Sequence, residues 1–187
     1  MKKVAVLLAT GFEEIEALAT VDILRRAKIA VTLTSVEESL VVEGSHNIRV
    51  VADILLDDLD ASSVQMIVLP GGLPGATRLK GNPKVIKLIQ DFESAGKAVA
   101  AICAAPIVLG EAGILQDTNA VCYPGFESQL IGANILDRGV VVDGAIITAK
   151  GAGLTYAFAL EIIGYLMGKE IAKEVQEKML IPDVFLS

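Results

Sequence analysis

The chain has 187 residues, of which 53% are hydrophobic, and a formal net charge of −7 at pH 7. This length and composition are typical of one globular domain, residues 1–187, with a sizeable core. The acidic balance argues against nucleic acid or an anionic membrane as a partner. The uncharged, mostly apolar stretch 98–110 is shorter than the roughly 18 apolar residues that a membrane-spanning helix needs.

Apolar runs of strand length alternate with helical patterns along the whole chain. The predicted strands are 4–9, 31–36, 66–69, 99–102, 120–123 and 140–149, and the predicted helices are 13–26, 82–95, 154–167 and 170–179. Segments 40–42 and 48–52 predict a hairpin, the one antiparallel insertion in the pattern. The alternation predicts an α/β sandwich around a mostly parallel sheet.

Cys103 stands where the predicted strand 99–102 gives way to a helix. Ala101 and Ala105, two residues away on either side, leave room for the tight turn of a nucleophile elbow. The N–H groups at the start of the following helix favour a thiolate. The pattern indicates a nucleophile or redox centre, and the alternative is a free cysteine that packs as a small hydrophobic residue.

The loops after Ala9, Leu69 and Ile102 share the carboxyl edge of the sheet if their strands are parallel. Residues in these loops are then expected to converge near Cys103. The N–H groups of Gly71, Gly72 and Ala104 are candidates to bind a developing oxyanion, because glycine lets the backbone approach closely. The alternative is that Gly71 and Gly72 merely form a turn.

Acidic residues crowd the start of the predicted helix 13–26. Glu13 and Glu14 are interpreted as an ordinary, exposed first turn that complements the helix dipole. Glu16 lies among apolar residues and is expected to point inward. Burial and a neighbouring thiolate raise the proton affinity of a carboxyl group, so Glu16 is a candidate to hydrogen-bond to sulfur and to carry a proton during catalysis.

His46, the single histidine of the chain, falls in the predicted hairpin and is either a pocket residue or an ordinary turn residue. Cys103 and Cys122 are nineteen positions apart, and with one histidine they have no spacing typical of a metal site, so no metal is expected. A disulfide between them is not expected either, which favours a reducing cytoplasm.

Four segments together resemble the ThiJ/PfpI family, and specifically its DJ-one branch. They are Gly11-Phe12-Glu13-Glu14-Ile15-Glu16-Ala17, Val68-Leu69-Pro70-Gly71-Gly72, Ala100-Ala101-Ile102-Cys103-Ala104-Ala105-Pro106, and Gly151-Ala152-Gly153 followed by Phe158-Ala159-Leu160. The resemblance covers nearly the whole chain and implies a flavodoxin-like three-layer sandwich and a homodimer. Apolar residues around the predicted helix 13–26, including Leu18, Val21 and Leu24, also favour a homodimer.

The resemblance further implies a reactive Cys103, readily oxidised to a sulfinate that Glu16 holds, with the amides of Gly72 and Ala104 at the site. It implies a cofactor-free glyoxalase or deglycase that acts on methylglyoxal-type α-oxoaldehydes or their adducts. The rival function is an oxidative-stress redox sensor or chaperone-like protein that acts through Cys103 sulfinate formation.

The chain departs from the pattern of this family at two pocket positions. Tyr123 stands where well-studied members carry a histidine, and His46 stands where they carry an anion-binding arginine, while Gly151 keeps the late glycine turn. In PfpI-type proteases a histidine directly follows the nucleophile, whereas here Ala104 does. Peptidase activity is therefore not expected.

Overall fold

The computed structural model describes residues 1–183 and contains one large sheet. Its strands are β1 (Lys3–Leu8), β2 (Ala30–Ser35), β5 (Ile54–Leu55), β6 (Met66–Leu69), β7 (Ala98–Ile102), β10 (Val140–Asp143) and β11 (Ile146–Ala149). Within the described residues the order is β10-β11-β7-β6-β1-β2-β5, and every neighbouring pair is parallel except β10 and β11. The principal strands β2-β1-β6-β7-β11 follow the flavodoxin-like order, whose topological switch point lies between β1 and β6.

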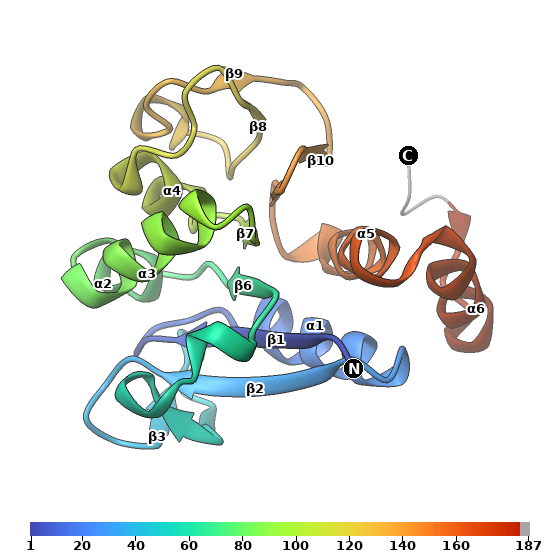
Figure 1. Cartoon of the computed structure of the whole chain (residues 1–187), viewed down its shortest axis with the longest axis horizontal. Coiled ribbons are helices and arrows are strands. Elements are labelled where there is room, and N and C mark those ends of the chain that lie inside the picture. Colours follow the sequence, from blue (N-terminus) through green and yellow to red (C-terminus); the bar gives the residue numbers. More distant parts are fainter. Residues whose placement is uncertain (184–187) are drawn as a thin grey trace.

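Helices cover both faces of the sheet and make a three-layer sandwich (Figure 1). One face carries α1 (Glu14–Arg26), α5 (Thr155–Met167) and α6 (Lys169–Met179), and the other carries α2 (Gly75–Lys80), α3 (Pro83–Ser94) and α4 (Pro106–Ala112). Val4, Val6 and Leu8 of β1 pack toward the first group, and Ala5 and Leu7 toward the second, because successive strand residues point to opposite faces. The predicted flavodoxin-like α/β sandwich is therefore confirmed.

The hairpin predicted over 40–52 is confirmed. It pairs β3 (Val41–Glu43) with β4 (Arg49–Val51) in antiparallel register. It is not the one antiparallel insertion, however, because the run 140–149 forms two strands rather than one. A turn at Gly144, whose φ is +56°, reverses the chain between β10 and β11. The Asp143-Gly144 pair is a hairpin signal that the apolar run obscured.

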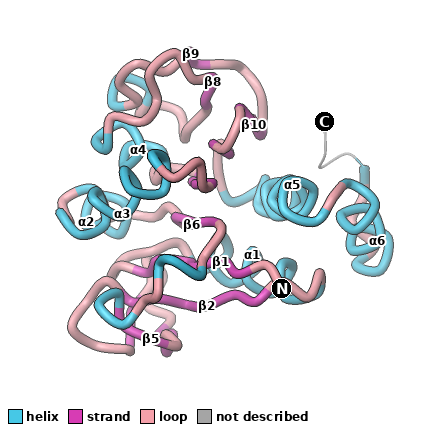
Figure 2. The backbone as a smooth tube through the Cα atoms, viewed as in Figure 1, coloured by secondary structure: helices cyan, strands magenta, loops and turns pink. Residues whose placement is uncertain are grey.

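The predicted strand 120–123 is correct only at its first residue. β8 (Asn119–Ala120) pairs in parallel with β9 (Asn134–Ile135) in a separate small sheet, within the loop-rich region between α4 and β10 (Figure 2). The strand ends there because the N–H of Val121 donates to Oγ1 of Thr148, at 3.0 Å, instead of joining a ladder. Three short elements, β5, β9 and α2, were not predicted at all.

Apolar residues around α1 are buried by other parts of the same chain. Val21 is 5% exposed and Leu24 fully buried, since α1 packs against both the sheet and α5. The expectation that these two residues face a partner chain is therefore wrong. Among residues 1–183, no helix combines the length and apolar character needed to cross a membrane.

Candidate active site

Three loops meet at the carboxyl edge of adjacent parallel strands. They follow β1, β6 and β7 and bring Glu16, Gly71 and Cys103 together, as their spacing predicted. Glu16 and Gly71 flank the switch point of the sheet, where open α/β sheets place their ligand sites. Cys103 completes the group from the next strand.

Cys103 occupies the sharp turn between β7 and α4. Its φ is +63°, a conformation that non-glycine residues rarely adopt and that recurs at functional turns. Two backbone hydrogen bonds hold it there: its N–H donates to the carbonyl of Ala149 at 2.8 Å, and its carbonyl accepts from the N–H of Tyr123 at 2.7 Å. Ala101 and Ala105 are fully buried, so larger side chains have no room beside the turn. The geometry is that of a nucleophile elbow.

Glu16 is 1% exposed and reaches from the first turn of α1 toward the thiol. Its Oε2 accepts a hydrogen bond of 2.7 Å from the N–H of Gly71. The carbonyl of Gly71 in turn accepts from the N–H of Glu13 at 2.8 Å, and Oε2 of Glu13 caps the helix by accepting from the N–H of Glu16 at 2.7 Å. These reciprocal bonds fix the carboxyl group against the loop.

Burial raises the pKa of Glu16 from an ordinary 4.5 to about 7, and the negative charge of Glu13 adds to this shift. The hydrogen bond from Gly71 and the interaction with Cys103 act in the opposite direction. Oε1 of Glu16 is buried without a hydrogen-bond partner of ordinary geometry. A carboxyl group with this pKa exchanges its proton readily at neutral pH, as general acid–base chemistry requires.

Three effects raise the pKa of Cys103 to about 12. Burial is the largest, and the negative charge of Glu16 and its hydrogen bond to the thiol are smaller. The amides of Ala104 and Gly72 oppose the shift. The expectation that the helix start lowers this pKa is wrong here, because burial and the carboxylate outweigh the two amides. A proton passed from Cys103 to Glu16 removes the charge that opposes the thiolate, so the pair titrates as one unit.

The predicted amide donors divide into two kinds. The N–H groups of Gly72 and Ala104 are directed at the Cys103 side chain, as an oxyanion site next to the nucleophile requires. The N–H of Gly71 is used by Glu16 instead. We therefore reassign Gly71 from an oxyanion donor to a residue that positions the carboxyl group.

Glu14 and His46 form a second polar group beside this site. Glu14 is only 5% exposed, so its interpretation as part of an exposed first turn is wrong. Its oxygens accept from the N–H of His46 at 2.7 Å and contact Nδ1 of the same residue at 2.7 Å. Although burial opposes ionisation, these hydrogen bonds hold the pKa of Glu14 below its usual value, and the same contact raises the pKa of His46. His46 thus fastens the hairpin to α1.

The remaining predicted pocket residues lie against the elbow. The Tyr123 ring is half exposed, and its backbone is bonded to Cys103 as described above. A Cβ added to Gly151 would lie 3.4 Å from that ring, so Gly151 and Tyr123 are neighbours. Cys122 is buried, and both cysteines are free.

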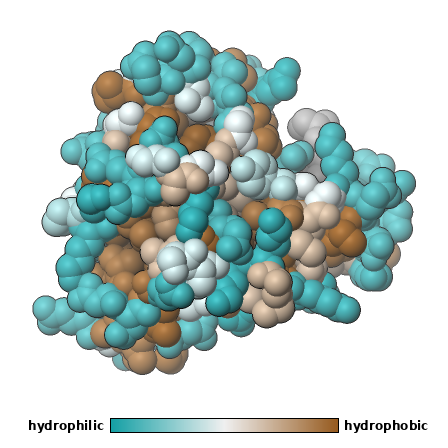
Figure 3. All heavy atoms as spheres, viewed as in Figure 1, coloured by the Kyte–Doolittle hydropathy of each residue, from teal (hydrophilic) through white to brown (hydrophobic). Residues whose placement is uncertain are grey.

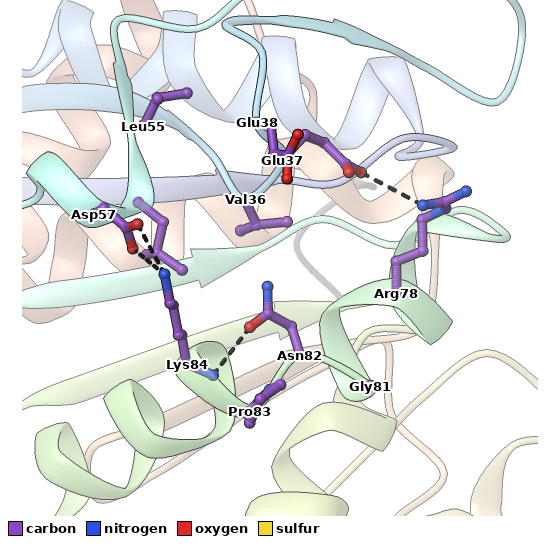
Figure 4. A pocket seen from close by; sticks show the side chains of 11 residues that line it. Val36, Glu37, Glu38, Leu55, Asp57, Arg78, Gly81, Asn82, Pro83 and Lys84 are labelled. Atoms are coloured by element: carbon purple, nitrogen blue, oxygen red, sulfur yellow. Dashed lines mark hydrogen bonds and ion pairs between the residues drawn. The ribbon is translucent and has the colours of Figure 1, made fainter.

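A cavity of about 760 Å³ lies at another part of the same sheet edge, between the loops that follow β2 and β5 and the junction of α2 with α3 (Figure 4). Two ion pairs border it: Arg78 with Glu37 at 3.9 Å, and Lys84 with Asp57 at 2.6 Å. Apolar surface is visible in the same region among hydrophilic side chains (Figure 3). Cys103 and Glu16 are not among the residues that line this cavity.

Comparisons with known proteins agree with this arrangement. Protein dj-1beta of Drosophila melanogaster is 37% identical over 182 residues, which cover 96% of this chain and 97% of that protein. DJ-1 homologs B and A of Arabidopsis thaliana are 39% and 40% identical over 96% of this chain, which spans only 42% and 47% of their lengths.

The structure of Toxoplasma gondii DJ-1, described as oxidized, matches with a TM-score of 0.92 at 36% identity and covers 96% of this chain and 98% of that chain. A family model for the DJ-1/PfpI family matches residues 2–164. With its elbow cysteine and the carboxyl group beside it, the chain belongs to the DJ-1/PfpI family.

Proposed function

We propose that the protein is a cofactor-free, cysteine-dependent glyoxalase or deglycase that acts on small α-oxoaldehydes or their adducts. The observation that carries this proposal is the contact between Cys103 and Glu16, a nucleophile and a carboxyl group whose pKa is about 7. α-Oxoaldehydes offer an electrophilic carbon to a thiolate and an adjacent carbonyl to which a proton can be moved. Cys103 can supply the thiolate, and Glu16 can move the proton.

In the first step Glu16 accepts the thiol proton while sulfur adds to the aldehyde carbon of methylglyoxal. The product is a hemithioacetal, whose oxygen takes up the proton from Glu16 and becomes a hydroxyl group, so that Glu16 is again a carboxylate. The amides of Gly72 and Ala104 stabilise the negative charge that develops on this oxygen. The buried site keeps the sulfur close to the reacting carbon.

In the second step the Glu16 carboxylate removes the proton from the carbon bound to sulfur and returns it to the neighbouring carbon, while the proton of the hemithioacetal hydroxyl group passes to the ketone oxygen. The ketone becomes a secondary alcohol and the hemithioacetal becomes a thioester, with no net change in oxidation state. Water then cleaves the thioester, which releases lactate and restores the Cys103 thiol. A deglycase reaction uses the same addition on an adduct of an amine or a thiol.

A second candidate function is redox sensing through oxidation of Cys103 to a sulfinate. The partial exposure of Cys103 and the protonated form of Glu16 beside it favour this candidate, because a carboxylic acid can donate a hydrogen bond to a sulfinate oxygen. The related Toxoplasma protein is described as oxidized. Peptidase activity is not proposed, since Ala104 follows the nucleophile.

One pair of measurements separates the two functions. Purified protein is incubated with methylglyoxal, lactate is quantified, and Cys103→Ser and Cys122→Ser are compared with the unchanged protein. We expect turnover that Cys103→Ser abolishes and Cys122→Ser keeps. Stoichiometric sulfinate at Cys103 under mild peroxide, with no lactate above the Cys103→Ser background, would instead favour the sensor.

We also propose a homodimer and a reducing compartment such as the cytoplasm. Ile15, Ile48 and Val51 are 54%, 51% and 66% exposed, and the N–H of Ile48 donates to Glu14, next to Ile15 in the chain. Exposed apolar side chains on α1 and on the hairpin bonded to it favour burial against a second copy. The free cysteines support the reducing compartment.

A further inference from the structure

Three metal-ligating side chains converge at the start of α1, although their spacing in the sequence gave no sign of a metal site. One oxygen each of Glu13 and Glu14 and one nitrogen of His46 lie within 4.8 Å of one another. We propose that these three residues bind a divalent transition-metal ion of the zinc type. This inference is independent of the function proposed for Cys103 and Glu16.

The distances suit such an ion. Nδ1 of His46 lies 2.7 Å from Oε2 of Glu14 and 4.0 Å from Oε1 of Glu13. Imidazole nitrogen and carboxylate oxygen bind zinc at roughly 2.0–2.2 Å, which separates ligand atoms around a tetrahedral ion by roughly 3.3 Å. The His46 side chain is 68% exposed, so its ring has room to rotate and bring Nδ1 between the two carboxylates.

Other contacts hold the two carboxylates in place. Oε1 of Glu14 accepts from the N–H groups of His46 and Ile48, and Oε2 accepts from Oγ of Ser45 at 3.2 Å. Oε2 of Glu13 accepts from a helix N–H, which leaves Oε1 directed toward the imidazole. Hydrogen bonds to metal ligands orient those ligands and increase the affinity for the metal.

The backbone also makes room for the Glu14 carboxylate. A Cβ added to Gly44 would lie 2.3 Å from its Oε1. The carboxylate is thus seated in the hairpin turn rather than projecting into solvent. A ligand fixed in this way loses little side-chain freedom when it coordinates an ion.

The charge of the cluster favours a cation over a simple ion pair. An ion pair with the His46 imidazolium needs only one carboxylate, and Glu14 provides that carboxylate. The Glu13 side chain, 13% exposed, and the Glu14 side chain, 6% exposed, both face the same nitrogen. The imidazole thus faces one carboxylate more than an ion pair uses, and a divalent ion can bind both carboxylates and the imidazole together.

The test uses Zn²⁺ as the probe, with the protein carrying Cys103→Ala and Cys122→Ala so that no thiol competes. Calorimetry should show one zinc ion per chain, and Glu13→Gln and His46→Gln should each weaken binding roughly 10-fold or more. Glu43→Gln is the matched control, because this hairpin carboxylate pairs with Arg49 outside the cluster. The Glu43→Gln variant should bind zinc with unchanged affinity.

The single histidine supplies a second readout. In a long-range ¹H–¹⁵N spectrum the one imidazole of the chain should show Nδ1 changing from a protonated to a metal-bound nitrogen as zinc is added. If the double cysteine variant does not fold, Co²⁺ replaces zinc in the unchanged protein, where thiolate ligation would produce a strong sulfur-to-cobalt band. Such a band, an unperturbed imidazole spectrum, or full affinity in Glu13→Gln would each overturn the proposal.

Discussion

A Cβ added to Gly71 would lie 2.7 Å from the Cβ of Cys103, so the glycine loop and the nucleophile are in contact at the level of the backbone. The same added atom would lie 2.8 Å from Oε2 of Glu16 and 2.9 Å from the carbonyl oxygen of Ile102. The oxygen of Glu16 cannot move away without breaking its hydrogen bond to the N–H of Gly71. Residue 71 must therefore lack a side chain for the pair to meet.

Gly71→Ala should reduce methylglyoxal turnover roughly 100-fold or more, because the methyl group pushes the carboxyl group and the thiol apart. Overpacking of this kind should also lower the free energy of unfolding by roughly 1–3 kcal/mol. Gly153→Ala is the control, since a Cβ there meets nothing within 4 Å. Lactate assays and urea titrations of both variants check the prediction, and equal turnover in the two would contradict it.

Glu16→Gln should lower turnover roughly 100-fold or more while the fold persists, because the amide keeps the size of the side chain but cannot transfer a proton. In the unchanged protein, turnover should rise with pH through about 7, as the Glu16 carboxylate that accepts the thiol proton forms.

The controls for this variant must avoid Glu13 and Glu14, which contact the helix start and the hairpin. The exposed Glu161 on α5 serves instead. A turnover in Glu16→Gln that matches Glu161→Gln would remove the proton-transfer role.

The raised pKa of Glu16 also predicts how stability depends on pH. Its value is about 7 in the folded protein and near 4.5 in the unfolded chain, so the folded state binds the proton more tightly. The contribution to stability is therefore complete below about pH 4.5 and is lost as the pH rises through about 7. With about 1.36 kcal/mol for each pKa unit, the loss is roughly 3 kcal/mol.

Glu16→Gln should not show this loss. Relative to the unchanged protein, its free energy of unfolding should therefore increase by roughly 3 kcal/mol between pH 4.5 and pH 8. Urea titrations of both proteins at the two pH values measure the difference. A constant difference would mean that Glu16 titrates normally.

Cys103 should be oxidised before Cys122 under mild peroxide, because Cys103 is partly exposed whereas Cys122 is 3% exposed. Peptide mass spectrometry checks the order. Alkylation of Cys103 at pH 8 should accelerate roughly 10-fold in Glu16→Gln, since removal of the negative charge lowers the pKa of the thiol. Faster alkylation combined with slower turnover would separate the charge effect of Glu16 from its role in proton transfer.

The proposed homodimer predicts that Ile15→Glu or Val51→Glu yields a monomer, because an unpaired charge in a buried apolar contact is costly. Val142→Glu is the control, an exposed apolar residue on the edge strand β10. Sedimentation velocity at micromolar concentration distinguishes the outcomes. A monomeric unchanged protein would rule the dimer out.

Local pattern was enough to predict the principal strands and the elbow. β6 begins and ends where its apolar run does, and β7 leads into Cys103 with small residues on both sides. Glu16 was predicted to point inward from its apolar neighbours alone. These features are encoded in a few adjacent residues, and the carboxyl ends of parallel strands then bring the loops together.

Short elements could not be predicted in this way. β5 has two residues and forms because Thr34 and Ser35 of β2 offer an unpaired edge, not because Ile54 and Leu55 have a distinctive pattern. The strand expected at 120–123 stops early because a side chain of β11 captures the next N–H. Both outcomes depend on a neighbour far away in the chain.

The hydrogen-bonded pairs of the site were likewise decided only by the tertiary structure. The sequence determined that Cys103 sits in an elbow and that an acid lies within its reach, because both follow from local sterics and strand order. It did not determine that Gly71 donates to Glu16, 55 positions away, or that Glu14 is buried against His46, 32 positions away. Such pairs form when folding brings distant backbone and side-chain groups together in a space that excludes water, where each buried polar group needs a partner.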